Sequence, residues 1–375
     1  MKISVIGLGY VGFELFKLLF KNSKENFIQG YDCSEEKIKN IPKEFSLNVS
    51  SNENSLQNSN VFIICVPTPL DSDNYPDYSY INGAIKTISN YINKNSTIII
   101  ESTITPGYTE SCIDKILSKN TELKYGDFSV VFAPERFAPN SDIPMECIDK
   151  LIGYNDIRGK EIANKIYSSF MKAPLHFCTI KEAEFSKLME NTQRETLISF
   201  ANQMYMIANE MNINFDNVLK MAETKYNFVK DIKPGFVGGH CLSVDSIFLR
   251  TIVNTKYVIS TNLIDEVIEN NNSIIDYEVR KIVKLNKGIE SLIVVLKRVS
   301  YKPNSDDIRN SKQIEFYNKL KRNGISVFAF DSNVNRDEVY KKHNIELITH
   351  KDFEYLEKTH TKISYNKTGD YEIWI

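Results

Sequence analysis

The sequence predicts an α/β protein in which two sheets of parallel strands are joined by a long central helical region. Three observations lead to this prediction. Short apolar strands alternate with helical segments over the first 180 residues, helical spacing then runs from Lys181 to Met211, and a second strand-and-helix unit begins near residue 291. Alternation of strands and helices indicates parallel sheets, because parallel neighbours need a long crossover that is usually a helix.

The length of 375 residues is too great for one ordinary hydrophobic core, so we expect several domains. The changes of pattern divide the chain into an N-terminal α/β domain (1–180), a central helical domain (181–285) and a C-terminal α/β domain (286–375). Hydrophobic residues make up 42% and charged residues 25% of the sequence, which is typical of a globular protein with a large core.

Charge and cysteine content exclude several classes of protein. The formal net charge of −2 argues against nucleic acid as the main partner. The six cysteines are irregularly spaced, so we expect no metal site, no disulfide framework and a reducing cytoplasmic location. The N-terminus runs directly into a strand without a secretion signal, and no stretch of about eighteen apolar residues predicts a membrane span.

The first strand, Lys2–Ile6, leads into a glycine-rich turn and then into an apolar helix from Phe13 to Phe20. This order is a dinucleotide-binding fingerprint, because the glycines permit a tight turn and the helix N-terminus offers N–H groups and a positive dipole end to a pyrophosphate. We expect the cofactor to lie against Gly7, Gly9, Tyr10, Val11 and Gly12.

The second strand, Phe27–Tyr31, ends at Asp32, twenty residues after Gly12. An acidic residue at this place accepts hydrogen bonds from the ribose hydroxyls and disfavours a 2′-phosphate, so the sequence predicts NAD and not NADP. The alternative is a glycine-rich turn of some other α/β protein. The succession of strand, loop, helix, strand and acid favours the cofactor site.

Further strands follow at the intervals expected of α/β units, at residues 61–66, 97–101, 130–133 and 175–178. Three of them end in polar or proline-containing loops, at residues 67–69, 102–107 and 134–136. Because ligands bind outside the carboxyl ends of strands in an open parallel sheet, these loops are candidate walls of a site. Ordinary strand exits of the same composition are the alternative.

The long helix predicted from Lys181 to Met211 carries Glu184, Lys187, Asn191 and Arg194 at offsets of three, four and three. These polar residues share one stripe of the helix. A solvated face is the simple explanation. Because the stripe interrupts an apolar context, we expect it to face a cleft. A second helix, 215–223, leads to a glycine-rich loop.

That loop, Lys233–Asp245, contains a proline, three glycines and Cys241. Glycine lets a backbone turn tightly and approach a ligand closely, so such a loop can hold a thiol against a substrate. The alternative reading of Cys241 is a small buried hydrophobic residue after a turn.

The chain reads as helical again after Asp245, as far as residue 285. A second Rossmann-like unit follows, with a strand at 291–296, a polar loop at 301–311, a helix at 312–323 and a strand at 325–330. The last forty residues are weakly patterned, with a hairpin expected near residues 367–370.

Taken in order, these motifs resemble the UDP-glucose/GDP-mannose dehydrogenase family over residues 1 to about 335. The resemblance is closest to the branch that acts on UDP-N-acetylhexosamines. The motifs that carry it are Gly7–Gly12, Val66–Pro69, Glu101–Thr103 with Pro106–Gly107, Pro134–Arg136, Glu184–Arg194, Gly238–Cys241 and Asp307–Ser311.

The resemblance implies a two-step oxidation of the sugar C6 alcohol to a carboxylate, with two NAD⁺ and one water consumed, for surface polysaccharide precursors. The Cys241 thiolate would capture the aldehyde as a thiohemiacetal, which is then oxidised to a thioester and hydrolysed. Lys187 and Asn191 would stabilise oxyanion character at C6, and Thr103, Glu135 and Asp245 would position or activate water.

The resemblance also implies two sets of binding residues, an NAD-binding domain (1–180), a catalytic loop (233–245), a UDP-sugar-binding C-terminal domain (286–375) and a homodimer formed through the central helices. The cofactor set adds Asp32, Lys37, Pro67, Thr68 and Thr103 to the fingerprint. The substrate set is Glu135, Arg136, Phe137, Lys187, Asn191, Arg194, Phe236, Gly238, Lys302 and Arg309.

Three departures from the family pattern affect the C-terminal half. Arg298 stands where relatives have glycine, Glu266 or Val267 stands where relatives have an arginine that reaches a neighbouring subunit's substrate, and a clear final apolar strand is lacking. Two alternative functions therefore stay open. One is a single-step β-hydroxyacid dehydrogenase, and the other is a catalytically idle protein that binds NAD or a sugar nucleotide.

Overall fold

The computed structural model describes residues 1–119, 122–124, 126–137, 143–240, 242–289, 292–365 and 370–374. Cys241 and the expected turn at residues 367–369 lie outside these described residues. The chain divides into two compact units, Met1–Glu190 and Asn191–Ile375. None of the helices in the described segments combines the length and the apolar character that crossing a bilayer requires.

The first unit is built on an eight-stranded sheet with the order β3-β2-β1-β4-β5-β6-β7-β8 among the described residues. All neighbouring strands pair in parallel except β6 and β7, which are antiparallel. The strands are β1 (Lys2–Ile6), β2 (Phe27–Tyr31), β3 (Val49–Ser50), β4 (Val61–Ile64), β5 (Thr97–Ile100), β6 (Ser129–Phe132), β7 (Lys150–Tyr154) and β8 (Leu175–Thr179).

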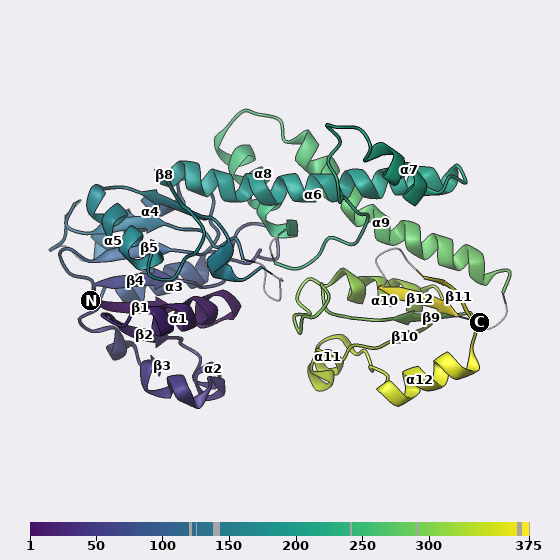
Figure 1. Cartoon of the computed structure of the whole chain (residues 1–375), viewed down its shortest axis with the longest axis horizontal. Coiled ribbons are helices and arrows are strands. Elements are labelled where there is room, and N and C mark those ends of the chain that lie inside the picture. Colours follow the sequence, from purple (N-terminus) through teal and green to yellow (C-terminus); the bar gives the residue numbers. More distant parts are fainter. Residues whose placement is uncertain are drawn as a thin grey trace. The chain divides into compact units, whose positions relative to one another are not determined.

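Helices cover both faces of this sheet (Figure 1). Side chains alternate across a strand, so Val61 and Ile63 of β4 pack in one core cluster, with α1 and α5, whereas Phe62 and Ile64 pack in another, with α3 and α4. The helical segments are α1 (Tyr10–Asn22), α2 (Glu35–Asn40), η1 (Lys43–Asn48), η2 (Glu53–Leu56), α3 (Ser79–Ile88), α4 (Tyr108–Lys119), η3 (Met145–Cys147) and α5 (Ile157–Tyr167).

The second unit combines long helices with a small sheet. The helix α6 (Ile180–Glu210) begins in the first unit and ends in the second. The other elements are α7 (Phe215–Ala222), α8 (Leu242–Lys256), α9 (Asn262–Asn286), β9 (Ile293–Leu296), α10 (Lys312–Arg322), β10 (Ser326–Ala329), α11 (Arg336–His343), α12 (His350–Thr359), β11 (Lys362–Tyr365) and β12 (Tyr371–Trp374).

The α/β class predicted from the sequence is confirmed, but the sheets are not parallel throughout: β6 and β7 are antiparallel in the first, and the second is mixed. In the order β10-β9-β12-β11, β10 and β9 pair in parallel, whereas β12 runs antiparallel to β9 and β11 runs antiparallel to β12. Connectivity explains the pairing of β11 with β12, because these strands are separated by only a few residues and so short a connection joins antiparallel strands.

The expectation that the chain lacks a clear final apolar strand is wrong. All four residues of β12 are buried, and the strand lies between β9 and β11. Its polar member, Glu372, made the segment look unlike a core strand. In the structure the Glu372 carboxylate pairs with Lys297 and Lys362, so the charge is neutralised beside the buried strand.

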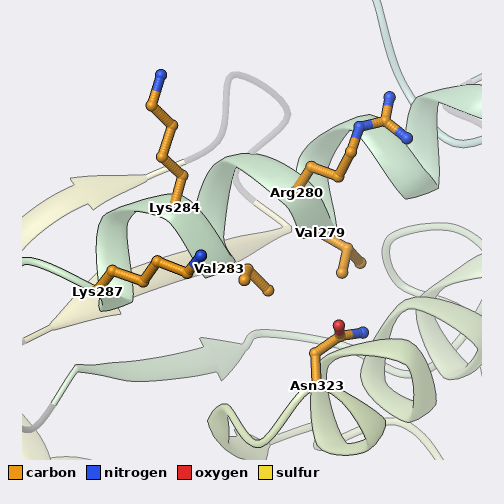
Figure 2. Close-up of a pocket in the computed structure, with 6 residues that line it drawn as sticks. All are labelled: Val279, Arg280, Val283, Lys284, Lys287 and Asn323. Carbon is orange, nitrogen blue, oxygen red and sulfur yellow. The ribbon is translucent and has the colours of Figure 1, made fainter.

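Two described hollows lie on the second unit, beside α9. One, of about 200 Å³, is lined by Val279, Arg280, Val283, Lys284, Lys287 and Asn323. Figure 2 shows Val279 and Val283 pointing toward Asn323, whereas Arg280 and Lys284 point away. The other, of about 630 Å³, is lined by Met206, Ile207, Glu210, Met211, Tyr277, Arg280, Lys281 and Lys284. Neither contains a residue predicted for the site.

Candidate active site

The glycine-rich turn after β1 is shaped by close backbone contacts. Gly7 has φ +90°, and a Cβ on it would lie 2.7 Å from the carbonyl oxygen of Cys65. A Cβ on Gly12 would lie 1.9 Å from the carbonyl oxygen of Gly7. Both positions therefore require glycine. A Cβ on Gly9 would meet nothing within 4 Å. Gly9 immediately precedes α1, which begins with Tyr10 and Val11, so a ligand can approach the backbone at this end of the helix.

Asp32 is tied to this turn. Its Oδ2 accepts the N–H of Leu8 at 2.9 Å and lies 3.3 Å from Lys37 Nζ, and its Oδ1 accepts the N–H of Ser34 at 3.0 Å. The structure thus brings together the glycine turn, the helix N-terminus, the acid and Lys37, all predicted cofactor residues. An open glycine at a helix N-terminus and an acid after β2 fit the pyrophosphate and the ribose hydroxyls of NAD.

The loops after β4 and β5 are joined by side-chain hydrogen bonds. Thr68 Oγ1 donates to the carbonyl oxygen of Thr103 at 2.8 Å, and Ser102 Oγ donates to the carbonyl oxygen of Val66 at 2.7 Å. These bonds fix the segments that contain Pro67, Thr68 and Thr103. The three predicted residues therefore lie at one edge of the sheet, where its parallel strands end.

Glu135 follows β6 at the same edge, and both of its carboxylate oxygens are engaged. Oε1 accepts the N–H groups of Arg136 at 2.8 Å and Phe137 at 2.6 Å, and Oε2 lies 2.9 Å from Lys150 Nζ. Lys150 was not predicted as a site residue. A lysine at the start of an apolar five-residue strand was the available signal, because a buried lysine needs an anionic partner.

Arg136 is paired within the first unit. Its Nε donates to Glu190 Oε2 at 3.0 Å, another guanidinium nitrogen lies 2.9 Å from Glu190 Oε1, and Nη1 donates to the carbonyl oxygen of Asp149 at 2.8 Å. This two-pronged arrangement is the usual geometry of an arginine with a carboxylate. The substrate role assigned to Arg136 and Phe137 stays a prediction.

The polar stripe predicted on α6 does not face a cleft throughout, because Glu184 is fully buried against α4. Its carboxylate accepts the N–H of Gly107 at 2.6 Å, and the N–H and hydroxyl of Thr109 at 3.1 and 2.6 Å. The carboxylate satisfies N–H groups at the start of α4 and complements the positive end of that helix. Glu184 is therefore a capping residue. Lys187, the next member, is buried, whereas Arg194 is exposed.

In the second unit, α6 and α8 bring two predicted catalytic residues together. Asn191 Nδ2 donates to Asp245 Oδ2 at 2.5 Å, and the Asp245 side chain is buried. The next residue of each helix forms a second contact, in which Ser246 Oγ donates to Thr192 Oγ1 at 3.2 Å. An amide nitrogen has two N–H groups, so Asn191 keeps a second donor besides the one given to Asp245.

The start of the glycine-rich loop is held by Asn202, a residue that the sequence analysis missed. The amide of Asn202 accepts the N–H of Gly235 at 2.8 Å and donates to its carbonyl oxygen at 3.0 Å. Asn202 also donates to Asn271 at 3.0 Å. An asparagine in an otherwise apolar stretch of a long helix was the available signal, because a buried amide must find partners.

The loop then packs on the segment 301–311. A Cβ on Gly239, which has φ +87°, would lie 2.6 Å from the Tyr301 ring, and one on Gly238 would lie 2.7 Å from the carbonyl oxygen of Asn310. The N–H of Gly239 donates to that same oxygen at 3.2 Å. Glycine is therefore required at both positions, and the turn before residue 241 is fixed against this segment.

Four further residues lie in the loop or in the segment beside it. Burial and the Arg309 charge lower the pKa of His240, so this imidazole is neutral at neutral pH. Arg309 forms two hydrogen bonds with Asp307, at 2.8 and 2.6 Å.

Lys302 Nζ lies 5.7 Å from the centre of the Tyr301 ring. Phe236 packs edge-on against Phe316 in the core, so it has a packing role in addition to any contact with a substrate.

The departures noted in the sequence lie at different kinds of position. Arg298 Nε donates to Asp370 Oδ1 at 2.7 Å, so this arginine links the end of β9 to the residue before β12. On α9, Val267 is buried whereas Glu266 is exposed. Arg298 therefore has a structural role in the mixed sheet.

Comparison with known proteins identifies the family. Residues 43–171, 181–273 and 295–365 match, in order, the NAD binding domain, the central domain and the UDP binding domain of the UDP-glucose/GDP-mannose dehydrogenase family. Residues 2–72 also match the family described as NADP oxidoreductase coenzyme F420-dependent. The first set covers most of the chain. The chain belongs to the UDP-glucose/GDP-mannose dehydrogenase family.

Three relatives illustrate the membership. Protein CapL of Staphylococcus aureus is 32% identical, over 95% of this chain and 88% of CapL. UDP-N-acetyl-D-glucosamine 6-dehydrogenase of Pseudomonas aeruginosa is also 32% identical, over 92% of this chain and 86% of that enzyme. The solved structure of the UDP-D-ManNAc dehydrogenase of Pyrococcus horikoshii is 31% identical, with a TM-score of 0.79 over 89% of this chain and 84% of that chain.

Membership of this dehydrogenase family agrees with the geometry of the first unit. The residues around Gly9 and Asp32 fit NAD, and the family match places an NAD binding domain over residues 43–171. The cofactor of this family member is therefore NAD.

Proposed function

We propose that this family member oxidises the C6 alcohol of a UDP-N-acetylhexosamine to the uronate, as a step toward a surface polysaccharide. The observation that carries the proposal is the pair formed by Asn191 and the buried Asp245, four residues after Cys241, in a chain of this family. Relatives named for N-acetylglucosamine and N-acetylmannosamine substrates support the sugar class.

In the proposed reaction, each of the three domains has a separate role. Residues 1–180 hold NAD, which when bound accepts a hydride at each of the two oxidation steps. Residues 181–285 supply the nucleophile and its neighbours, and residues 286–375 bind the UDP group, to which Lys302 and Arg309 are assigned. The matches to the family's central and UDP binding domains support the last two assignments.

Cys241 takes the role of nucleophile. The first oxidation removes a hydride and a proton from the C6 alcohol and leaves an aldehyde. Addition of the sulfur to the aldehyde carbon gives a thiohemiacetal, which can lose a second hydride and a proton to become a thioester. Water then breaks the carbon–sulfur bond, so the carboxylate leaves and the thiol is restored.

Asn191 and Lys187 stabilise the negative charge that develops on the C6 oxygen. Asp245 orients the Asn191 amide by accepting one of its N–H groups, which leaves the other for the substrate oxygen. Lys187 contributes a positive charge, and Glu135, held at the end of β6, serves as the base that activates water together with Thr103.

The stoichiometry of NADH release tests this function. We expect two NADH per sugar from at least one of UDP-N-acetylglucosamine, UDP-N-acetylmannosamine and UDP-N-acetylgalactosamine, and a much lower rate with UDP-glucose. One NADH per substrate would instead indicate a single-step dehydrogenase. Binding of NAD and UDP-sugars by calorimetry without NADH from any of them would indicate an idle binding protein.

We also propose that the protein is a cytoplasmic homodimer formed through its central helices. Phe200 and Ile207 of α6 are each 45% exposed, and their spacing of seven puts them on one side of the helix. Met211, the residue that follows the helix, is 62% exposed. A row of large apolar side chains is typical of a surface that another protein chain covers.

Replacing Ile207 with glutamate tests the dimer. A charge in the middle of an apolar interface is costly to bury, so we expect the variant to be monomeric in analytical ultracentrifugation where the parent protein is a dimer. Glu161→Lys, an exposed charge change on α5, is the matched control. A dimer that persists in the Ile207 variant would place the interface elsewhere.

A further inference from the structure

Lys150 is a lysine enclosed by the first unit. It is the first residue of β7, and its side chain is only 4% exposed. Lysine is seldom buried without an anionic partner, because removing an ammonium from water costs several kcal/mol. The position of this charge therefore depends on the groups around it.

Two carboxylates at the ends of neighbouring strands meet the Lys150 ammonium. Glu101 follows β5 and Glu135 follows β6, and Lys150 Nζ lies 2.5 Å from Glu101 Oε2 and 2.9 Å from Glu135 Oε2. The Tyr167 hydroxyl of α5 donates to the other oxygen of Glu101. The Glu101 side chain is fully buried, so Lys150 and Tyr167 hold it from two sides.

The charges in this cluster do not balance when both carboxylates are ionised. Burial raises the pKa of Glu101 to about 7, although the Lys150 charge acts in the opposite direction. Burial lowers the pKa of Lys150, but the two carboxylates outweigh it and the net shift is upward, so the ammonium stays charged. The two acids thus compete for one cation at neutral pH.

The other titratable groups beside the cluster stay neutral. Burial raises the pKa of the Cys65 thiol and of the Tyr167 hydroxyl well above their ordinary values. Cys65 comes from the end of β4 and Tyr167 from α5. Lys150 and Glu101 are therefore the charged members of the cluster beside Glu135, and the charge of the adjacent Arg136 is paired with Glu190.

We propose that Lys150 is the positioning residue that aims Glu135 and supplies the positive charge beside its carboxylate, and that Glu101 and Tyr167 hold Lys150 in place. The proposal rests on the proposed function, in which Glu135 activates water. Glu135 Oε1 is fixed by the N–H groups of Arg136 and Phe137, and Lys150 fixes Oε2. The carboxylate accordingly has one orientation, with its charge supported by an ammonium that solvent does not reach.

The geometry predicts opposite effects for the two partners of Glu135. Removing the Lys150 charge takes away the cation that favours ionised Glu135. Removing the Glu101 charge takes away an anion close to Glu135. It also leaves the Lys150 ammonium to Glu135 alone. A purely structural role would not give shifts of opposite sign, because loss of packing lowers stability without a preferred direction on the pH axis.

The test is the pH dependence of NADH release by full-length variants. For Lys150→Met we expect the acid limb of the kcat profile to move up by about one pH unit or more. We also expect kcat at pH 7 to fall about tenfold or more, with KM for the UDP-sugar within about twofold of the parent value. For Glu101→Gln we expect the acid limb to move to lower pH.

Two controls accompany these variants. Lys150→Arg keeps the charge and should restore most of the parent profile, whereas Lys172→Met removes an exposed lysine that pairs with Glu146 and should leave the profile unchanged. If Lys150→Met does not fold, the double variant Lys150→Met/Glu101→Gln replaces it. Its acid limb should lie above that of Glu101→Gln alone.

Unchanged profiles in folded Lys150 and Glu101 variants, or shifts in the same direction, would overturn the proposal. A measurement that does not require turnover distinguishes failure of this positioning role from failure of the proposed function. The carboxyl carbon of Glu135, assigned by its loss in Glu135→Gln, is titrated by ¹³C NMR and should show the same two opposite shifts. If those shifts appear while no UDP-sugar yields NADH, the positioning role stands and the function does not.

Discussion

A Cys241→Ala variant should form no detectable uronate from the UDP-sugar that the parent protein oxidises. Without the sulfur, an aldehyde made in the first step is not held as a tetrahedral adduct from which a second hydride can leave. Loss of a catalytic nucleophile commonly lowers turnover by about 10³-fold or more, so mass spectrometry of the product is sensitive enough to decide.

A second cysteine provides the matched control for this experiment. Cys147 is exposed in η3, and its replacement by alanine should leave uronate formation unchanged. Cys241→Ser retains a weaker nucleophile and should yield uronate more slowly than the parent. Full uronate production by Cys241→Ala would remove the covalent step from the mechanism.

Replacing Asn191 with alanine should lower kcat by about 10²-fold or more, because the proposed mechanism assigns its amide as a donor to the developing oxyanion. The substitution also leaves the buried Asp245 carboxylate without the 2.5 Å hydrogen bond that it now accepts from Asn191. We expect KM for the UDP-sugar to change much less than kcat, because the donor acts mainly in the transition state. Steady-state kinetics with NADH absorbance measures both quantities.

Gln193→Ala is the control for the Asn191 variant, because Gln193 is an exposed residue two positions along α6. It should have parent kinetics. Thermal unfolding of both variants checks whether the Asn191 substitution acts through stability. A variant that binds the sugar less tightly but turns over at the parent rate would make Asn191 a binding residue instead of a catalytic one.

The cofactor-binding part of the molecule could be predicted from the sequence because the motifs that mark it are close together in the chain. The glycine turn, the helix after it and the acid after β2 lie within 32 residues, and each depends on backbone geometry that the neighbouring residues set. The strands of the first sheet were recognised for the same reason, except the two-residue β3 and the longer β7. That strand begins with Lys150, and a charged residue in a buried strand hides the apolar pattern.

Contacts between residues far apart in the chain could not be predicted in this way. Glu184 was placed on a stripe facing a cleft, but it caps α4 through bonds to residues about 75 positions earlier. The pairing of β12 between β9 and β11 likewise depends on a strand 75 residues earlier, and Glu372 becomes acceptable there only through Lys297 and Lys362. Spacing along a helix or strand indicates which face a residue shares, but not what that face meets.

The sequence by itself determined the α/β class, the cofactor turn and the set of residues that mark the family, because these follow from local conformational preference and motif order. Only the tertiary structure decided which charges meet: Lys150 with Glu101 and Glu135, and Asn191 with Asp245. The physical reason is that a buried charge or amide is stabilised by whichever partner the packing brings within hydrogen-bonding distance, and that distance is a property of the folded chain.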